Sequence, residues 1–184
     1  MARCKICKTE FQRRSMTHKC CLPACAEIYA KEQTKKQVEK KVRAETKVRK
    51  EKLKTLHDWI RDAQTVFNKF IRLRDSGQRC ICCDTLPSAD RNQIGGSVDA
   101  GHYRSRGSAG HLRFSEDNCH AQKKQCNRWD AGNVVGYRIG LIKRIGLERV
   151  EALEQNNTPH KWTVDELKGI IEKYKLKIKE LEND

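Results

Sequence analysis

The chain has 184 residues, of which 37% are apolar and 34% are charged, and its formal net charge is +15. This length allows one moderate domain with appendages, and so polar a composition excludes a single large core that includes the whole chain. The positive charge predicts a polyanionic partner, with nucleic acid as the default, and the lack of long apolar segments excludes a membrane as the partner.

The N-terminal sequence "MARCKICKTEF" has no apolar stretch of the kind found in secretory signals, so we expect a cytoplasmic protein. Thiols stay reduced in that compartment. The ten cysteines therefore indicate metal sites before disulfides.

Residues 1–28 predict a zinc-binding module. They contain a C-x2-C pair followed, after a short basic loop, by a C-x3-C pair. Two such pairs can present four thiolates in tetrahedral geometry, and a segment this polar has almost no core without a metal. The predicted zinc ligands are Cys4, Cys7, Cys21 and Cys25. Cys20 can replace Cys21, and His18 is a further candidate.

Residues 29–76 predict a long basic helix. Its first half has no Gly or Pro and is dominated by Lys, Arg, Glu and Gln, which favour a helix but provide few apolar anchors. Its second half has an apolar stripe at three- and four-residue spacing, which comprises Leu53, Leu56, Ile60, Ala63, Phe67 and Phe70. We expect a helix that is solvated at its start, docks onto the core at its end, and stops at Gly77. The charged half is either a solvated linker or a direct DNA contact, and the pattern favours neither.

Residues 77–184 predict the compact domain, with an α+β fold. Turn residues and short apolar pieces between residues 80 and 103 favour short strands. The segment "SEDNCHAQKKQCNRW" favours a short helix that begins at Ser115 or Asn118.

The C-terminal part of this domain predicts further helices. Residues 134–153 have a helical pattern that glycines interrupt. Thr163 and Glu166 form a capping box, which predicts the start of a last helix with its own apolar stripe.

A second set of cysteines predicts another zinc site in the compact domain. Cys80 and Cys83 form a C-x2-C knuckle, and Cys126 lies about forty residues later. Cys119 precedes Cys126 by two helical turns, so we expect both on one helix face. A zinc ion would then tie the knuckle to this helix, although one of these cysteines can instead simply be buried.

The segment "DAGHY" predicts a catalytic site. Hydrolysis of a phosphodiester needs a base for water, a cation for the phosphoryl charge, and a group that fixes the tautomer of the base. His102 suits the first task, a divalent cation bound by Asp99 the second, and the amide of Asn118 the third. The alternative is that each histidine makes only a structural hydrogen bond. The predicted phosphate contacts are Arg104, Arg106, Arg113, Lys123, Lys124 and Arg128.

A strand-borne histidine, an asparagine and a helix beside a cysteine knuckle resemble the HNH endonucleases. The motifs "CICC", "DAGHYRS" and "CN", together with the N-terminal cysteines and the terminal "WT-EL" helix, resemble one family more closely, the phage lambda NinG (Rap) recombination endonucleases. The resemblance spans nearly the whole chain. It implies a small HNH-type ββα-metal finger with flanking helices, preceded by the basic helix and the zinc module. It also implies a phage- or prophage-encoded, Mg²⁺- or Mn²⁺-dependent nuclease that cuts branched DNA, such as D-loops and Holliday junctions, in the bacterial host.

The resemblance also assigns roles to residues. His102 would be the general base, Asn118 the middle asparagine, and Asn127 would replace a metal-binding histidine. Because an amide oxygen is a weak ligand, Asp99 and His120 would share the catalytic cation with Asn127.

One departure from the family concerns the second zinc site. The family has another C-x2-C pair where this chain has Lys123 and Cys126. Cys119 or Cys82 must then supply the fourth ligand, or the site is empty or weak.

Two other functions remain open. The chain can be a non-catalytic zinc-finger DNA-binding protein, or an HNH nuclease with sequence specificity. A homodimer is a further possibility, since an apolar stripe on the long helix serves a second copy as well as an intramolecular core.

Overall fold

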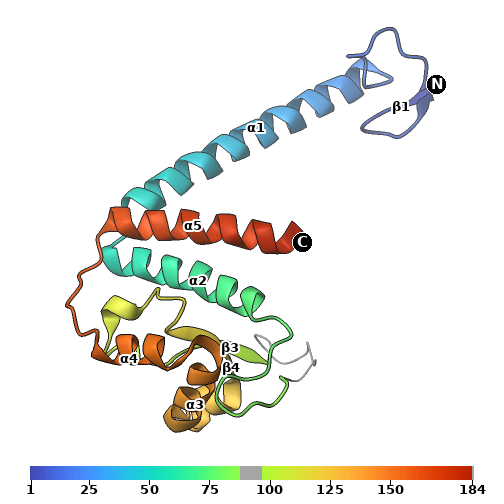
Figure 1. Cartoon of the computed structure of the whole chain (residues 1–184). Helices are drawn as coiled ribbons and strands as arrows, with labels where there is room; N and C mark the ends of the chain where they lie inside the picture. The colour runs from blue at the N-terminus through green and yellow to red at the C-terminus, as the bar shows by residue number, and fades with distance from the viewer. Residues whose placement is uncertain (88–96, 184) are drawn as a thin grey trace. The chain divides into compact units, whose positions relative to one another are not determined.

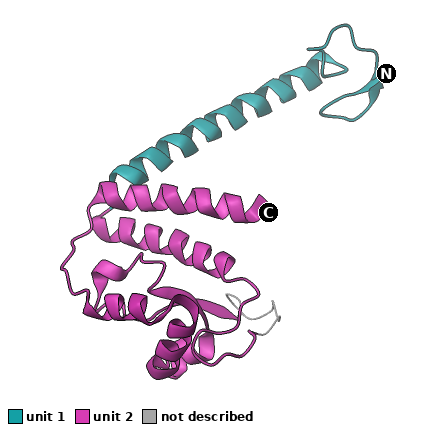
Figure 2. Ribbon diagram, in the orientation of Figure 1, with its two compact units in different colours: residues 1–54 teal, residues 55–184 magenta. Residues whose placement is uncertain are grey.

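The computed structural model describes residues 1–87 and 97–183. Contacts divide the chain into two compact units, Met1–Lys54 and Thr55–Asp184 (Figure 2). The three-part division by composition stays a prediction. Among the helices of the described residues, none is long and apolar enough to span a bilayer.

The first unit is a small hairpin followed by one long helix. Strands β1 (Ala2–Arg3) and β2 (Glu10–Phe11) pair antiparallel, and helix α1 (Pro23–Lys52) follows. Proline at the first helical turn fits the helix start, because its missing N–H would have no partner there. None of the 30 residues of α1, all within the described part of the chain, is buried. Its charged side chains therefore lie in solvent within this unit, as expected.

The prediction of one continuous basic helix is wrong. Helix α1 ends at Lys52, and a separate helix α2 (Leu56–Arg74) begins the second unit. Thr55 Oγ1 accepts a hydrogen bond from the Asp58 backbone N–H (3.3 Å), and Asp58 Oδ2 accepts one from the Thr55 N–H (3.0 Å). Such a capping box stabilises a helix start by about 1 kcal/mol. Leu53 is 74% exposed, so the apolar stripe begins only inside α2.

Helices α2 and α5 (Val164–Asn183) lie side by side and form the larger core of the second unit (Figure 1). Phe67 and Phe70 of α2 each pack their rings 4.9 Å from that of Tyr174 of α5. The predicted capping box of α5 is confirmed, with the Glu166 N–H 3.3 Å from Thr163 Oγ1. The two apolar stripes thus face each other within the chain.

Strands β3 (Val98–His102) and β4 (Cys119–Lys123) form an antiparallel pair in which His102 is opposite Cys119. The predicted helix from Ser115 or Asn118 is therefore wrong. Pairing with β3 places this segment in a strand that is buried on both faces. Such a strand lacks the alternation of apolar and polar residues by which a strand is recognised in a sequence. Only a short π-helical segment, η2 (Gln125–Trp129), follows it.

The two faces of the β3–β4 pair meet different cores. Ala100 and Cys119 pack against the α2–α5 core, because alternate residues of a strand face opposite sides. Gln122 faces the other side, where Gly101 leaves room for it: a Cβ at Gly101 would lie 2.1 Å from Gln122 Oε1. The fold is thus α+β, as predicted, with mostly helices and two small sheets.

A second, smaller core joins the remaining helices. It lies between η1 (Gly110–Leu112), α3 (Val134–Ile145) and α4 (Leu147–Gln155). The predicted interruption by glycines is confirmed only at Gly146, whose φ of +87° lies in the left-handed region that ends α3, whereas Gly136 and Gly140 lie inside α3 without interrupting it.

Candidate functional site

The N-terminal hairpin and the start of α1 bring the four predicted zinc ligands together. The sulfur atoms of Cys4, Cys7, Cys21 and Cys25 all lie within 4.8 Å of one another. Cys7 Sγ is 3.3 Å from Cys21 Sγ, which in turn is 4.0 Å from Cys25 Sγ. These separations suit four thiolates around one zinc ion.

The other two candidates of this module have different surroundings. Cys20 is buried, and the Nδ1 of His18 accepts a hydrogen bond from the Arg14 N–H (3.3 Å). Burial alone would raise the pKa of the Cys4 thiol, but backbone N–H groups directed at its sulfur lower the pKa to about 5. A thiol that ionises so readily is a good metal ligand.

The second cluster comprises Cys80, Cys82, Cys83 and Cys126, with sulfur atoms again within 4.8 Å. Of the two candidates for the fourth position, Cys82 lies in this cluster, and Cys119, which was also named as a possible ligand, does not. Cys119 is in a strand instead of a helix, and its side chain points into the α2–α5 core. The cluster therefore has four cysteine sulfurs despite the lysine at position 123.

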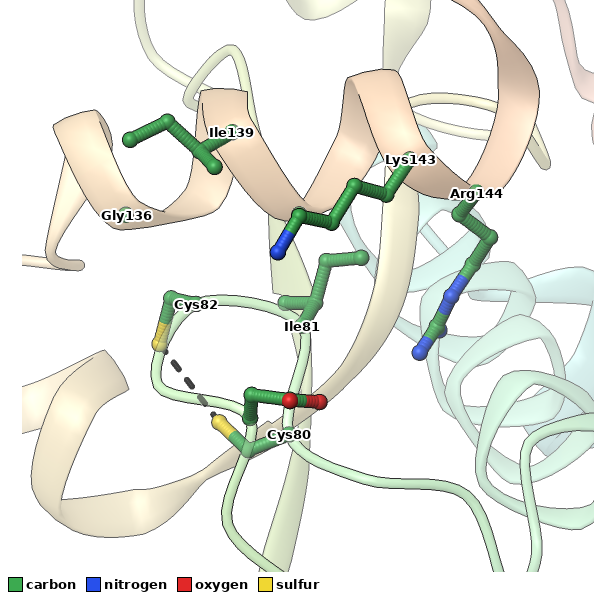
Figure 3. A pocket seen from close by; sticks show the side chains of 9 residues that line it. Cys80, Ile81, Cys82, Gly136, Ile139, Lys143 and Arg144 are labelled. Atoms are coloured by element: carbon green, nitrogen blue, oxygen red, sulfur yellow. Dashed lines mark hydrogen bonds between the residues drawn. The ribbon is translucent and has the colours of Figure 1, made fainter.

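The cysteine knuckle is tied to β4 and to α3. The Lys123 N–H donates to Cys80 Sγ (3.2 Å), and Gln122 Nε2 donates to Cys82 Sγ (3.4 Å). Figure 3 shows the knuckle beneath α3, on which Gly136 and Gly140 allow close approach: a Cβ at Gly140 would lie 1.7 Å from the Ile81 carbonyl oxygen. A zinc ion in this cluster would fix the end of β4 and the start of η2, which adjoin the candidate catalytic residues.

The candidate catalytic residues His102, Asp99 and Asn127 line a polar cavity of about 410 Å³. Helix α2, strand β3, the loop after β3, and η2 contribute its walls. The lining residues are Asn68, Arg72, Asp99, Ala100, His102, Ser105, Arg106, Asn127 and Arg128. The cavity thus unites His102, Asp99 and Asn127, which the sequence pattern had proposed for one site.

His102 is held in one tautomer by the main chain. Its Nε2 lies 2.9 Å from the Arg113 carbonyl oxygen, so Nε2 bears the proton and donates it to that oxygen. Nδ1 is then unprotonated and accepts a hydrogen bond from the Cys119 thiol, whose sulfur lies 3.7 Å away. Burial, together with the positive charges of Arg106 and Arg113, lowers the pKa of His102 to about 4. At neutral pH this imidazole is therefore a neutral base.

The tautomer-fixing role expected of Asn118 falls to the Arg113 carbonyl. Asn118 is fully buried, and its amide accepts from the Arg104 N–H (2.8 Å) and donates to the carbonyls of Arg104 (3.0 Å) and Leu112 (3.2 Å). It therefore holds the loop between β3 and β4. By positioning that loop, Asn118 also positions the carbonyl that binds His102.

Asp99 and Asn127 are in contact. Asn127 Nδ2 donates to Asp99 Oδ2 (3.0 Å). Arg128 also binds this carboxylate through both oxygens, with Nε 2.7 Å from Oδ2 and Nη2 2.9 Å from Oδ1. Partial burial opposes ionisation, but the hydrogen bonds from Arg128 and Asn127 keep the pKa of Asp99 below its usual value. A carboxylate and an amide oxygen are donors that Mg²⁺ or Mn²⁺ accepts, and such an ion would replace Arg128.

His120 does not lie at this cavity, contrary to the expectation that it shares the cation. It is not among the residues that line the cavity, and its ring lies with Arg74 and Asp75, which do not line it either. There Nδ1 lies 2.9 Å from Arg74 Nη2 and 3.5 Å from Asp75 Oδ2. Burial lowers the pKa of His120, which indicates a neutral ring in a structural network.

The predicted phosphate contacts divide into bound and available side chains. The Arg104 guanidinium donates to the carbonyls of Leu153 (2.8 Å) and Asn156 (2.5 Å), so it stabilises the end of α4 instead. Arg106 is exposed at the cavity, and Arg128 is exposed but paired with Asp99.

The remaining three cations differ in their surroundings. Arg113 is half-buried near Gln64 of α2, with Nη1 3.4 Å from Gln64 Oε1. Lys123 and Lys124 are also half-buried. Lys123 is the last residue of β4, and Lys124 lies between β4 and η2.

Two cavity residues come from a helix that the sequence pattern had assigned to packing. Asn68 and Arg72 of α2 line the cavity beside β3. With Gln64 they form a polar row at four-residue spacing, next to the apolar stripe. Residues four apart lie on one face of a helix, so this row indicates a polar face beside the packing face of α2.

Comparison with known proteins shows relatives of similar length. The family model described as "Bacteriophage Lambda NinG protein" matches residues 1–184. Protein ninG of Escherichia phage 933W is 41% identical, with 98% of this chain and 94% of the relative covered. The ninG proteins of Escherichia phage lambda (40% identical; 98% and 93% covered) and Salmonella phage P22 (39% identical; 97% and 93% covered) are similar. No solved structure matches. Since the family model and these relatives both extend over nearly the whole chain, the protein belongs to the NinG family of bacteriophage lambda and related phages.

Proposed function

We propose that this protein is a metal-dependent endonuclease that cuts branched DNA, such as D-loops and Holliday junctions, during phage recombination. One observation supports this most directly: His102, a neutral ring whose Nε2 donates to the Arg113 carbonyl, lines one polar cavity together with Asp99 and Asn127. The order of strand β3, strand β4 and short helix η2 beside a cysteine knuckle agrees with an HNH-type ββα-metal finger.

In the proposed reaction, the neutral His102 ring takes a proton from the attacking water. The Arg113 carbonyl accepts the hydrogen bond from Nε2, which stabilises the imidazolium as it forms. Asp99 and Asn127 would hold one Mg²⁺ or Mn²⁺, which when bound neutralises charge on the phosphoryl group and the leaving oxygen. Arg106, and Arg128 once it leaves Asp99, bind the phosphates on either side.

Binding to DNA would rest mainly on phosphate contacts. The net charge is +15, and α1 has ten Lys and Arg against five Glu. Such a surface binds DNA through counterion release, with affinity that falls steeply with salt and with little reading of bases. Structural zinc in the two cysteine clusters would hold the N-terminal hairpin and the knuckle in place.

The decisive test compares His102→Ala with His57→Ala on a four-way DNA junction. His57 is an exposed histidine of α2 outside the cavity. With Mg²⁺ or Mn²⁺ present, His102→Ala should lose several orders of magnitude in cleavage rate while its junction affinity stays unchanged. The His57→Ala protein should cleave normally.

Other results would favour the other candidate functions. If the wild-type protein binds DNA but never nicks it with either ion, the protein is a non-catalytic zinc-dependent DNA-binding protein. If it cuts linear duplex at one sequence as well as it cuts junctions, it is a sequence-specific nuclease.

A further inference from the structure

Trp129 differs from the other two tryptophans in its exposure. Trp59 is 7% exposed, and the Trp162 indole donates to the Gly110 carbonyl (3.0 Å) and packs against Phe114. Trp129 is 77% exposed. Within residues 1–87 and 97–183, its ring has neither a hydrogen-bond nor a ring partner. Single exposed apolar side chains are common, so exposure alone does not indicate a function for Trp129. The position of Trp129 in the chain is the further evidence.

In the chain, that position directly follows residues of the candidate catalytic cavity. Trp129 is the last residue of η2, directly after Asn127 and Arg128, whose side chains line the cavity. Lys124 precedes η2, and Arg72 and Arg106 line the same cavity. A large exposed aromatic ring therefore follows, in the chain, two residues of this basic cavity.

The backbone at Trp129 is held in place on both sides. Cys126, three residues earlier, is buried in the second cysteine cluster. The Asp130 N–H donates to the Gln125 carbonyl (3.2 Å), and the Asn133 N–H donates to the Asp130 carbonyl (2.8 Å). The backbone around the ring is therefore fixed, so a ligand has to order only the two side-chain torsions of Trp129.

An exposed aromatic ring with basic neighbours fits one chemical partner well, a nucleic acid base. Stacking on an aromatic side chain contributes about 1–3 kcal/mol per base and does not depend on sequence. Inside a linear duplex both faces of each base are already covered by neighbouring bases. A base face becomes available where stacking is interrupted, as at a branch.

We propose that Trp129 stacks on an unpaired or unstacked base at the branch point of the DNA substrate. This contact favours branched DNA over linear duplex, while the surrounding cations bind both. The inference rests on the proposed action on branched DNA, for which it supplies a residue that recognises the branch.

A protein partner is the main alternative occupant of this region. Val134, Val135 and Ile139 of the following helix α3 are 56%, 75% and 53% exposed. The charges next to Trp129 favour DNA over an apolar protein surface, since Arg128 and Lys124 would have to lose their hydration at such an interface.

The test is equilibrium binding of the zinc-loaded, full-length protein without added Mg²⁺ or Mn²⁺. The DNAs are a four-way junction with 2-aminopurine at the branch and a linear duplex of equal length. Trp129→Ala should weaken junction binding about tenfold, or about 1.4 kcal/mol, and duplex binding less than twofold. Trp129→Phe should restore most of the loss, and Val135→Ala, the matched exposed apolar control, should change neither affinity.

Fluorescence gives an independent readout of the same contact. Junction DNA should quench the tryptophan emission of the wild-type protein much more than that of Trp129→Phe. The 2-aminopurine emission should fall on binding to wild-type protein and change little with Trp129→Ala.

Three results would overturn the inference. Equal losses on junction and duplex would assign Trp129 to general DNA binding, and no loss on either would leave the ring without a DNA contact. A change in oligomeric state of Trp129→Ala, seen by sedimentation with unchanged DNA affinity, would assign the ring to a protein interface. None of these results depends on cleavage, so a failure of the nuclease proposal would be seen separately in the His102→Ala comparison.

Discussion

The Nε2 of His102 donates a hydrogen bond to the Arg113 carbonyl oxygen at 2.9 Å, and this one contact determines which ring nitrogen can act as a base. The pKa of this histidine is lowered to about 4, first by burial. The ring is therefore neutral above that pH and becomes unable to accept a proton only below it. We predict that single-turnover cleavage of a junction stays constant from about pH 7.5 down to pH 5.5 and falls near pH 4 to 5. A decline centred near pH 6.5, the ordinary histidine value, would contradict this environment for His102.

Arg128 is predicted to compete with the catalytic cation. It binds both oxygens of Asp99, so a cation there must displace it. Arg128→Ala should increase the affinity of the DNA-free protein for Mn²⁺ up to about fivefold, the range expected for an exposed ion pair. Electron paramagnetic resonance of free Mn²⁺ measures this directly. Arg138→Ala, which breaks the comparable Arg138–Glu154 pair, is the control and should leave Mn²⁺ affinity unchanged. Equal or weaker Mn²⁺ binding by Arg128→Ala would place the cation elsewhere.

Zinc content should distinguish Cys82 from Cys119. The two cysteine clusters of the described residues predict two zinc ions per chain, and Cys82 belongs to the second cluster. Cys82→Ser should lower the zinc content to about one ion per chain, because three thiolates bind zinc more weakly. Cys119→Ala should keep both ions, since its sulfur points into the α2–α5 core. Elemental analysis after gel filtration provides the measurement, and zinc loss in Cys119→Ala alone would contradict the assignment.

Asp75 is predicted to be a main determinant of stability in the second unit. It is 4% exposed and accepts hydrogen bonds from Arg74 (2.7 Å) and the Ala121 N–H (2.8 Å), with Arg144 at 3.4 Å. Asp75→Asn would leave buried positive charge without its partner, which costs about 3–5 kcal/mol of unfolding free energy. Urea denaturation measures the loss. Asp117→Asn, which removes a surface pair with Arg149, should cost less than about 1 kcal/mol.

The same carboxylate gives a pH dependence of defined sign. Burial opposes its ionisation, but hydrogen bonds from His120 and Arg74 hold the pKa of Asp75 far below its usual value. Its stabilisation is therefore complete above the unfolded value of about 3.9 and is lost as the pH falls below it. Acid unfolding of wild-type protein should be steeper than that of Asp75→Asn. Parallel acid-unfolding curves for the two proteins would contradict this.

Local sequence patterns were sufficient for several features. The capping box at Thr163 depends only on neighbouring residues and was predicted, as was a glycine interruption between residues 134 and 153, which occurs at Gly146 alone. The C-x2-C and C-x3-C spacings likewise brought the N-terminal cysteines together, because each pair is closed by a short turn. The missed capping box at Thr55 was equally local, since "TLHD" has the required spacing.

Features that depend on strand pairing were not determined by local pattern. The segment from Cys119 to Lys123 became a strand because β3 lies beside it, and this exchanged the roles of Cys119 and Cys82 and turned His120 away from the cavity. A strand alternates its faces every residue, whereas a helix repeats about every fourth, so one change of element redirects each side chain. The sequence by itself determined the α+β class, the residue types of the site and the family. Tertiary structure alone decided which atoms meet, since the Arg113 carbonyl, Asn68 and Arg72 reach the cavity only through packing between distant segments.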